Sequence, residues 1–288
     1  MDVNSYTTLI TAEQLLQIHP NPAGVMVFDC SFDLMDAASG ETAFGQAHIP
    51  GAVYADLNRN LSDKTGQGIN GGRHPLPSPE KFAQWLGASG FSNPMQAVVY
   101  DRQGANYCGR LWWMLKWLGH AQVAVLDGGW QAWLAAGGAA ASGPAPGYPQ
   151  AAFAPKPSHW VLENTESVAS KLGRPGQTLI DARATPRYKG EVEPLDPVAG
   201  HIPGALNRPF SHNIGPDGKF KPAAQLKSEF EVLLAGRNPA TVVHHCGSGV
   251  SAIPNLLAME IAGLGPTALY AGSWSEWCSD ASRPMAQG

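Results

Sequence analysis

The sequence predicts two tandem α/β domains, each a small parallel sheet with helices on both faces. Three observations support this prediction: the chain length, an internal repeat, and short apolar strands that alternate with helical stretches. At 288 residues the chain is long enough for two domains of about 100–150 residues each.

The internal repeat is the most specific of these observations, because self-similarity predicts the architecture before any helix is assigned. Residues 47–52 (AHIPGA) recur as residues 200–205 (GHIPGA). Further pairs of segments recur in the same order: 27–29 with 179–181, 98–101 with 243–246, and 127–133 with 271–277. Four ordered matches indicate that one domain has been duplicated.

The composition between the copies predicts where the domains meet. Residues 137–157 are rich in Gly, Ala, Pro and Ser and show no periodicity, which is typical of a linker that lies over a surface. We therefore expect one domain at 1–140, a linker at 141–157 and a second domain at 158–288. The first copy carries an extra Gly-rich loop around residues 65–73.

The expected elements follow the repeat. Apolar, β-branched runs predict strands at 97–100, 123–126, 178–180, 241–244 and 268–270. Capping residues and apolar periodicity predict helices at 11–18, 78–89 and 109–118. Strands this short and apolar, alternating with helices, indicate a buried parallel sheet.

Composition and charge exclude several classes of protein. A net charge of −4 with 15% charged residues does not suit a nucleic-acid-binding protein. No apolar run reaches the roughly 18 residues of a membrane span, and the first twenty residues hold Asp2 and Glu13 but no Lys or Arg, unlike a secretory signal. The four widely spaced cysteines favour neither zinc nor disulfides, so we expect a cytoplasmic protein with free thiols. The chemistry inferred below is also expected to need no metal or organic cofactor.

The segment 241–252 (TVVHHCGSGVSA) carries the chemistry. It predicts a strand, a tight glycine-containing loop and the start of a helix, with Cys246 at the carboxyl end of the strand. Ligands of open α/β sheets bind at this edge. Loop N–H groups and the helix dipole favour a thiolate, so Cys246 is the candidate nucleophile. His244 and His245 point to opposite sides of the strand and are interpreted as structural.

The loop sequence CGSGVSA resembles the active-site loop of the rhodanese family of sulfurtransferases, in particular the 3-mercaptopyruvate type. The paired HIPGA segments, residues 181–183 (DAR) and residues 272–277 (GSWSEW) are similar to the two signatures of rhodanese domains. The resemblance covers nearly the whole chain. It implies that the first domain is catalytically silent, in agreement with Asp101 at the position that Cys246 occupies in the second copy.

The resemblance also implies a donor. Rhodaneses that use thiosulfate carry cations in this loop, whereas the loop here carries none, which favours 3-mercaptopyruvate. Its carboxylate is then expected on Arg187, since a guanidinium can donate two parallel hydrogen bonds to a carboxylate. Relatives usually offer a second arginine directly after Glu-Pro, where this chain has Leu195. The predicted substrate-binding residues are Arg187, Gly247, Gly249, Val250, Ser251 and Tyr107.

Further catalytic residues are implied by the same resemblance. Ser248 resembles the loop serine that exchanges a proton with the pyruvate enolate, and His74 resembles its partner across the cleft. The carboxylate of that relay corresponds to Asn58 here, with Asp56 and Asp63 nearby. Tyr107 and Arg110 of the silent domain are expected to line the cleft.

The implied reaction moves sulfur from a small-molecule donor through a Cys246 persulfide to a thiol such as that of thioredoxin, or to cyanide. Thiosulfate:cyanide sulfurtransferase is the alternative enzyme. A cysteine phosphatase of this fold needs an arginine six residues after the cysteine, where Ala252 stands. A redox-sensing module without catalysis is a third hypothesis.

Overall fold

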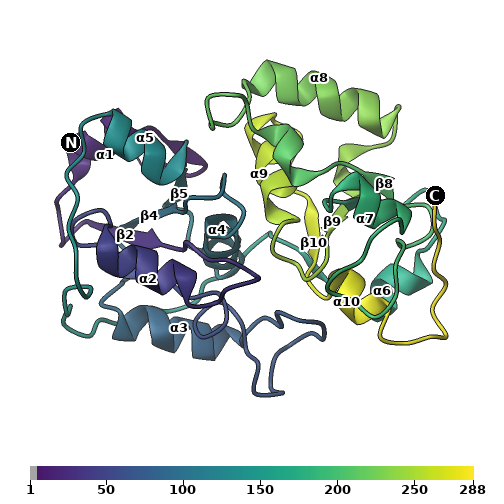
Figure 1. Cartoon of the computed structure of the whole chain (residues 1–288), viewed down its shortest axis with the longest axis horizontal. Coiled ribbons are helices and arrows are strands. Elements are labelled where there is room, and N and C mark those ends of the chain that lie inside the picture. The colour runs from purple at the N-terminus through teal and green to yellow at the C-terminus, as the bar shows by residue number, and fades with distance from the viewer. Residues whose placement is uncertain (1–4) are drawn as a thin grey trace. The chain divides into compact units, whose positions relative to one another are not determined.

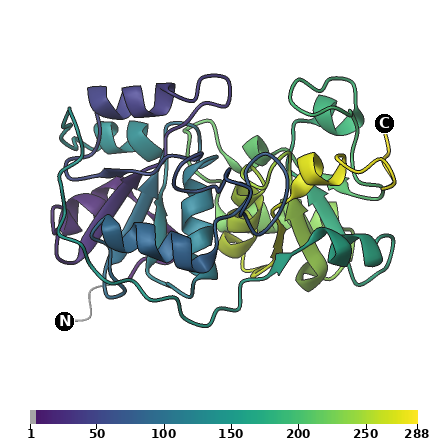
Figure 2. The same ribbon diagram turned by 90° about the horizontal axis from the view of Figure 1, so that it is seen from below.

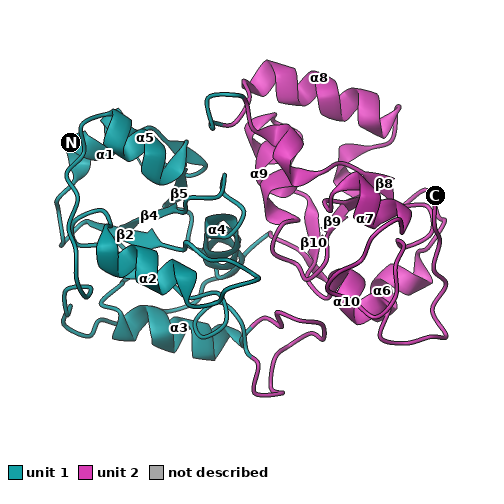
Figure 3. Cartoon of the chain, in the orientation of Figure 1, with its two compact units in different colours: residues 1–63, 77–159, 216–219 teal, residues 64–76, 160–215, 220–288 magenta. Residues whose placement is uncertain are grey.

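The structure, a computed structural model, describes residues 5–288 and consists of two compact units (Figure 1, Figure 2). Unit 1 holds the described residues up to 63 together with 77–159 and 216–219, and unit 2 holds 64–76, 160–215 and 220–288 (Figure 3). Residues 64–76, which include the predicted extra loop, therefore belong to unit 2 although they come from the first half of the sequence.

Unit 1 is built on a five-stranded parallel sheet in the order β1-β5-β4-β2-β3. Its strands are β1 (Leu9–Ile10), β2 (Val25–Asp29), β3 (Val53–Tyr54), β4 (Gln96–Tyr100) and β5 (Val123–Leu126). Its helices are α1 (Ala12–Ile18), α2 (Ser39–Gln46), α3 (Pro79–Ala88), α4 (Cys108–Trp117) and α5 (Gly129–Ala135).

Both faces of this sheet are covered. Val27 of β2 belongs to a core that includes Leu15 of α1, Phe44 of α2 and Trp133 of α5. Phe28, the next residue, points to the opposite face, where its ring lies 5.9 Å from that of Trp85 in α3. This alternation is the period of two that a strand imposes on its side chains.

Unit 2 repeats the arrangement with strand order β6-β10-β9-β7-β8. Its strands are β6 (Leu162–Glu163), β7 (Thr178–Asp181), β8 (Leu206–Asn207), β9 (Val242–His245) and β10 (Ala268–Tyr270). Its α-helices are α6 (Thr165–Ser170), α7 (Thr185–Lys189), α8 (Ala223–Leu234), α9 (Ile253–Ile261) and α10 (Ser273–Trp277), with 3₁₀ turns at Phe210–Asn213 and Pro239–Thr241. The predicted fold class is confirmed, because each strand of the first sheet has a counterpart in the same place in the second.

Local chemistry explains where the predicted elements begin. Thr11 caps α1 in a capping box with Gln14, and Ser78 caps α3 ahead of Pro79. The strand expected at 241–244 begins one residue later, because the Asn238 side chain caps a 3₁₀ turn that includes Thr241. Within residues 5–288 there is no helix long and apolar enough to cross a membrane.

The segment predicted as a linker, 141–157, contains neither a helix nor a strand, and its only ladder contact is an isolated bridge from Ala141 to His48. It is nevertheless anchored on unit 1. Phe153 is buried and its ring stacks 5.7 Å from that of Phe91, and Tyr148 donates a hydrogen bond to the carbonyl of Gly51.

Candidate active site

Cys246 directly follows β9, the strand that lies between β10 and β7, and the loop after it leads into α9. This is the carboxyl edge of the sheet, as the sequence predicted. The Cys246 side chain is buried, with 2% of the residue exposed. Any donor must therefore enter the loop itself to reach the sulfur.

The segment after β10 holds this loop in place. Cys246 N–H donates to Ser273 Oγ at 3.1 Å, Trp274 N–H donates to Cys246 O at 3.0 Å, and Ser275 N–H donates to Gly247 O at 2.9 Å. Gly249 has φ +73°, and a Cβ there would lie 2.3 Å from the carbonyl oxygen of Ala271. The close approach of two backbones therefore requires glycine at this position.

Ser273 has a left-handed backbone, with φ +55°, and is fully buried. Its hydroxyl also donates to Tyr270 O at 3.0 Å, so it joins β10 to the Cys246 loop. We expect Ser273→Ala to lower the free energy of unfolding by about 1–3 kcal/mol, because it leaves Cys246 N–H unpaired while keeping the strained backbone. Ser273→Gly removes the same bonds but relieves the strain, so it should be less destabilised in urea unfolding. Equal losses in the two variants would show that the backbone strain is negligible.

The first copy of the repeat shows how such a loop binds an anion. The carboxylate of Asp101 accepts four hydrogen bonds from backbone N–H groups of its own loop, at 2.8–3.0 Å. The donors are Gln103, Ala105, Tyr107 and Cys108. Convergent amides of this kind form an anion-binding nest. In unit 1 the nest is filled by the carboxylate of Asp101, which stands where unit 2 has Cys246.

The two loops are held by equivalent contacts. Trp130 N–H donates to Asp101 O at 3.1 Å, as Trp274 N–H does to Cys246 O, and Gly129 has the same φ of +55° as Ser273. An amide cradle around the Cys246 thiolate, like the one around the Asp101 carboxylate, stays a prediction.

His74 and Ser248 meet beside the nucleophile. His74 Nδ1 lies 2.8 Å from Ser248 Oγ, and both residues are buried. Gly72 allows this approach: it has φ +85°, and a Cβ there would lie 2.8 Å from the carbonyl oxygen of Gly272. The geometry suits a proton passed between the imidazole and the hydroxyl.

Arg187, in α7, lies next to Gly247, where a Cβ would be 3.6 Å from its Nη1. Its Nη2 and Nε donate to the carboxylate of Glu193 at 2.6 and 3.2 Å, and Nη2 lies 3.4 Å from Asp196 Oδ2. Burial raises the pKa of the Glu193 carboxyl, but the hydrogen bond from Arg187 and backbone donors outweigh it, so the pKa is lowered overall. Glu193 thus stays ionised and orients the guanidinium.

A second arginine at this place was not predicted. Arg73 forms an ion pair with Asp196 through Nη1, and its backbone N–H donates to Ser275 Oγ at 3.1 Å. Arg73 directly precedes His74, and Asp196 directly follows Leu195. These adjacencies could have drawn attention to Arg73 and Asp196, but no sequence motif connects the two residues.

The remaining loop residues that were predicted to bind substrate are Gly247, Gly249, Val250 and Ser251. The structure places them next to Cys246, with Val250 buried and Ser251 half-buried. They and Arg187 come together with Cys246, Ser248 and His74 in unit 2. Leu195 donates its N–H to Glu193 Oε1 at 3.0 Å.

Tyr107 is different, because it lies in unit 1. It is buried with its ring 5.5 Å from that of Phe32, and burial together with the nearby acids Asp33 and Asp101 raises the pKa of its hydroxyl to about 12. Arg110 is also buried in unit 1 and donates to the carbonyl of Leu61. A substrate contact of Tyr107 stays a prediction.

The acids considered for the relay also lie in unit 1. Asp56 accepts hydrogen bonds from the N–H groups of Asn58 and Arg59 at 2.8 Å, so it stabilises a turn. Asp63 is buried and pairs with Lys81 at 2.9 Å.

The two histidines before the nucleophile are fully buried, and burial lowers both pKa values, that of His244 to about 3. Burial therefore favours the neutral form of both imidazoles. In residues 5–288 no three His, Cys, Asp or Glu side chains are grouped so as to hold a metal ion.

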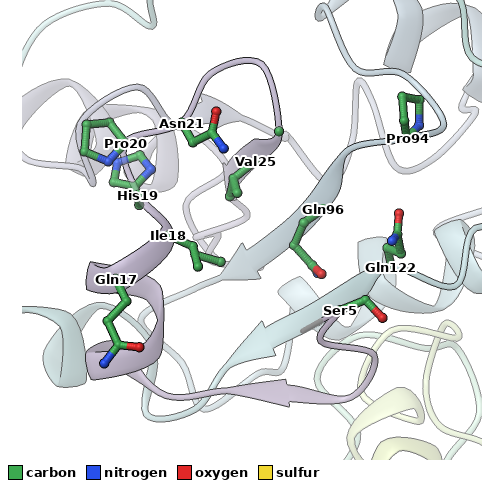
Figure 4. Close-up of a pocket in the computed structure, with 11 residues that line it drawn as sticks. Ser5, Gln17, Ile18, His19, Pro20, Asn21, Val25, Pro94, Gln96 and Gln122 are labelled. Atoms are coloured by element: carbon green, nitrogen blue, oxygen red, sulfur yellow. The ribbon is translucent and has the colours of Figure 1, made fainter. Parts of the chain in front are cut away.

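A separate hollow of about 480 Å³ lies in unit 1 (Figure 4). Val25 and Gln96, which line it, are the first residues of β2 and β4, so it opens at the amino edge of the sheet. Its lining residues include His19 but no cysteine. It is therefore distinct from the site around Cys246.

The chain is similar to known proteins over nearly its whole length. A family model described as a rhodanese-like domain matches residues 11–136 and 164–280. A probable 3-mercaptopyruvate sulfurtransferase of Pseudomonas aeruginosa is 46% identical over 285 residues, with 99% of each chain covered. A thiosulfate sulfurtransferase of Bos taurus is 32% identical over 88% of this chain and 85% of its own. The solved structure of the 3-mercaptopyruvate sulfotransferase SseA from Escherichia coli matches with a TM-score of 0.76 and 29% identity, over 94% of this chain and all of its own.

Proposed function

The chain belongs to the rhodanese family of sulfurtransferases, and we propose that it takes sulfur from 3-mercaptopyruvate and holds it as a persulfide on Cys246. The observation that carries this proposal is the grouping of Cys246, the His74–Ser248 pair and Arg187 around one uncharged loop. A nucleophile, a proton-transferring pair and a carboxylate-binding cation are what this donor needs.

The first half-reaction begins with attack of the Cys246 thiolate on the donor's thiol sulfur. A sulfur–sulfur bond forms while the carbon–sulfur bond breaks, and its electron pair passes to the carbon, so that a pyruvate enolate leaves. Ser248 donates a proton toward the enolate and recovers one from His74, whose ring nitrogen is within hydrogen-bond distance. Arg187 binds the donor's carboxylate.

In the second half-reaction, an acceptor attacks the outer sulfur of the persulfide and restores the Cys246 thiolate. A cytoplasmic thiol such as that of thioredoxin, or cyanide, fits this step, and the enzyme then follows ping-pong kinetics. The chemistry uses only the protein's own groups and needs no cofactor.

Thiosulfate is the second candidate donor, and the Bos taurus relative carries its name. The loop argues against it. Gly247, Ser248, Gly249 and Val250 provide no cation to offset a dianion, so we expect a higher kcat/KM for 3-mercaptopyruvate.

Intact-mass measurement tests the proposal directly. Unmodified protein treated with 3-mercaptopyruvate should gain about 32 Da, one sulfur atom, and release one pyruvate per chain. Parallel steady-state kinetics with thiosulfate, with cyanide as the acceptor in both series, compare the donors. A clear preference for thiosulfate would make the alternative donor correct, and no sulfur gain with either would refute sulfur transfer.

A further inference from the structure

We propose that Arg73 is the second cation that binds the donor's carboxylate, acting with Arg187 where the chain has Leu195 in place of an arginine. This inference rests on the proposed function and names a specificity-determining residue for it. The carboxylate would bind beside Gly247, the residue next to the nucleophile.

Both guanidinium groups converge on Gly247. A Cβ built on this glycine would lie 2.7 Å from Arg73 Nη2 and 3.6 Å from Arg187 Nη1. The two arginines come from different segments, 64–76 and α7, and both segments belong to unit 2. The absence of a side chain at Gly247 is what leaves room for them beside Cys246.

One buried acid holds both arginines. Asp196, with 2% of its side chain exposed, pairs with Arg73 through Nη1 and lies 3.4 Å from Arg187 Nη2. Glu193 binds the Nε and Nη2 of Arg187. Each guanidinium is therefore anchored along one edge.

The other edge of each guanidinium faces Gly247. Within residues 5–288, Arg73 Nη2 and Arg187 Nη1 make no hydrogen bond to the protein. They are also the two nitrogen atoms nearest to the position that a Cβ on Gly247 would occupy. Their side chains are 26% and 19% exposed, so a ligand can reach them. Two preoriented donors suit the two oxygens of a carboxylate.

The local charge favours a monoanionic group over a dianion. The two guanidinium groups are matched by the carboxylates of Glu193 and Asp196. Glu193 also pairs with Arg183, whose charge Asp181 balances, so the cluster has no excess positive charge with which to attract thiosulfate. Its selectivity comes from the placement of N–H donors next to Cys246. A donor whose thiol and carboxylate are separated by two carbons can reach both positions.

The test is Arg73→Gln in the full chain, with Arg174→Gln as the matched control, since Arg174 is exposed and lines a hollow beside Thr178 at the opposite edge of the sheet. Losing a charge-assisted bond should raise the KM for 3-mercaptopyruvate about ten- to a hundredfold, with kcat changed less than about threefold. Arg73→Lys should restore part of the affinity. The control should leave KM unchanged.

A second donor shows whether Arg73 binds the carboxylate or only supports the loop. The carboxylate-free analogue 1-mercaptopropan-2-one should have the same KM with Arg73→Gln as with the unmodified protein. An equal rise in KM for both donors would show that Arg73 only supports the loop, and no rise for 3-mercaptopyruvate would overturn the proposal.

A binding measurement makes this test independent of turnover. In a Cys246→Ser background, calorimetry with 3-mercaptopyruvate should show a dissociation constant raised about tenfold or more by Arg73→Gln. An unchanged constant refutes the role of Arg73. Failure of the unmodified protein to form a persulfide would instead refute the proposed function, whatever the binding result.

Discussion

Replacing Cys246 with serine should abolish sulfur transfer while the protein remains folded. The serine hydroxyl is far less acidic than a thiol and forms no persulfide, so neither half-reaction can occur. The replacement is nearly isosteric, and the backbone bonds of residue 246 to Ser273 and Trp274 do not involve the sulfur. We therefore expect no mass gain of about 32 Da with 3-mercaptopyruvate and an unchanged unfolding midpoint.

We do not expect the other cysteines to take over this role. Burial, followed by the neighbouring acids Asp29 and Asp101, raises the pKa of the Cys30 thiol well above its ordinary range, and burial with Asp101 does the same for Cys108. Burial also raises the pKa of Cys278. Cys278→Ala is the control that should retain full turnover. Sulfur transfer by the Cys246→Ser protein would contradict the assignment of the nucleophile.

Much of the fold could be predicted from the sequence, because each copy of the repeat contains local patterns that predict its strands and helices. Strands 123–126 and 268–270 were predicted with the bounds that the structure gives them, and the two sheets share one strand order. The place of Cys246 at the end of β9 follows from an apolar run, a glycine loop and a helix start in immediate succession. These signals are contained within a few residues.

What the sequence did not predict depends on contacts between distant residues. The loop 64–76 belongs to unit 2 because Gly72 packs on Gly272 and Arg73 donates to Ser275, about two hundred positions later. The ion pair of Arg73 with Asp196 spans 123 positions. A loop's own composition does not reveal which surface it will contact.

The same limit applies to the candidate site. Arg187 was identified by resemblance, but the acids that orient it, Glu193 and Asp196, were not, because a turn brings them back to α7. Tyr107 was expected to line the cleft and contact substrate from the first domain. Its burial against Phe32 is set by packing within unit 1, which no motif encodes.

Replacing Ser248 with alanine should lower kcat with 3-mercaptopyruvate about 10²–10⁴-fold, the usual contribution of a positioned proton donor. His74→Ala should cause a similar loss, because the two side chains lie 2.8 Å apart and act on the same proton. If they work as one unit, the double variant should be little worse than either single variant.

Two controls decide whether His74 transfers a proton or only positions Ser248. In His74→Asn, the amide replaces the hydrogen-bonding atom near Nδ1 but cannot exchange a proton at neutral pH, so a catalytic role predicts a loss as large as that in His74→Ala. The second half-reaction releases no enolate, so persulfide loaded onto each variant with excess donor should react with cyanide at the unmodified rate. Recovery of turnover by His74→Asn would assign His74 a positioning role alone, and an equal slowing of the cyanide step would show that the variants disturb the Cys246 loop rather than proton transfer.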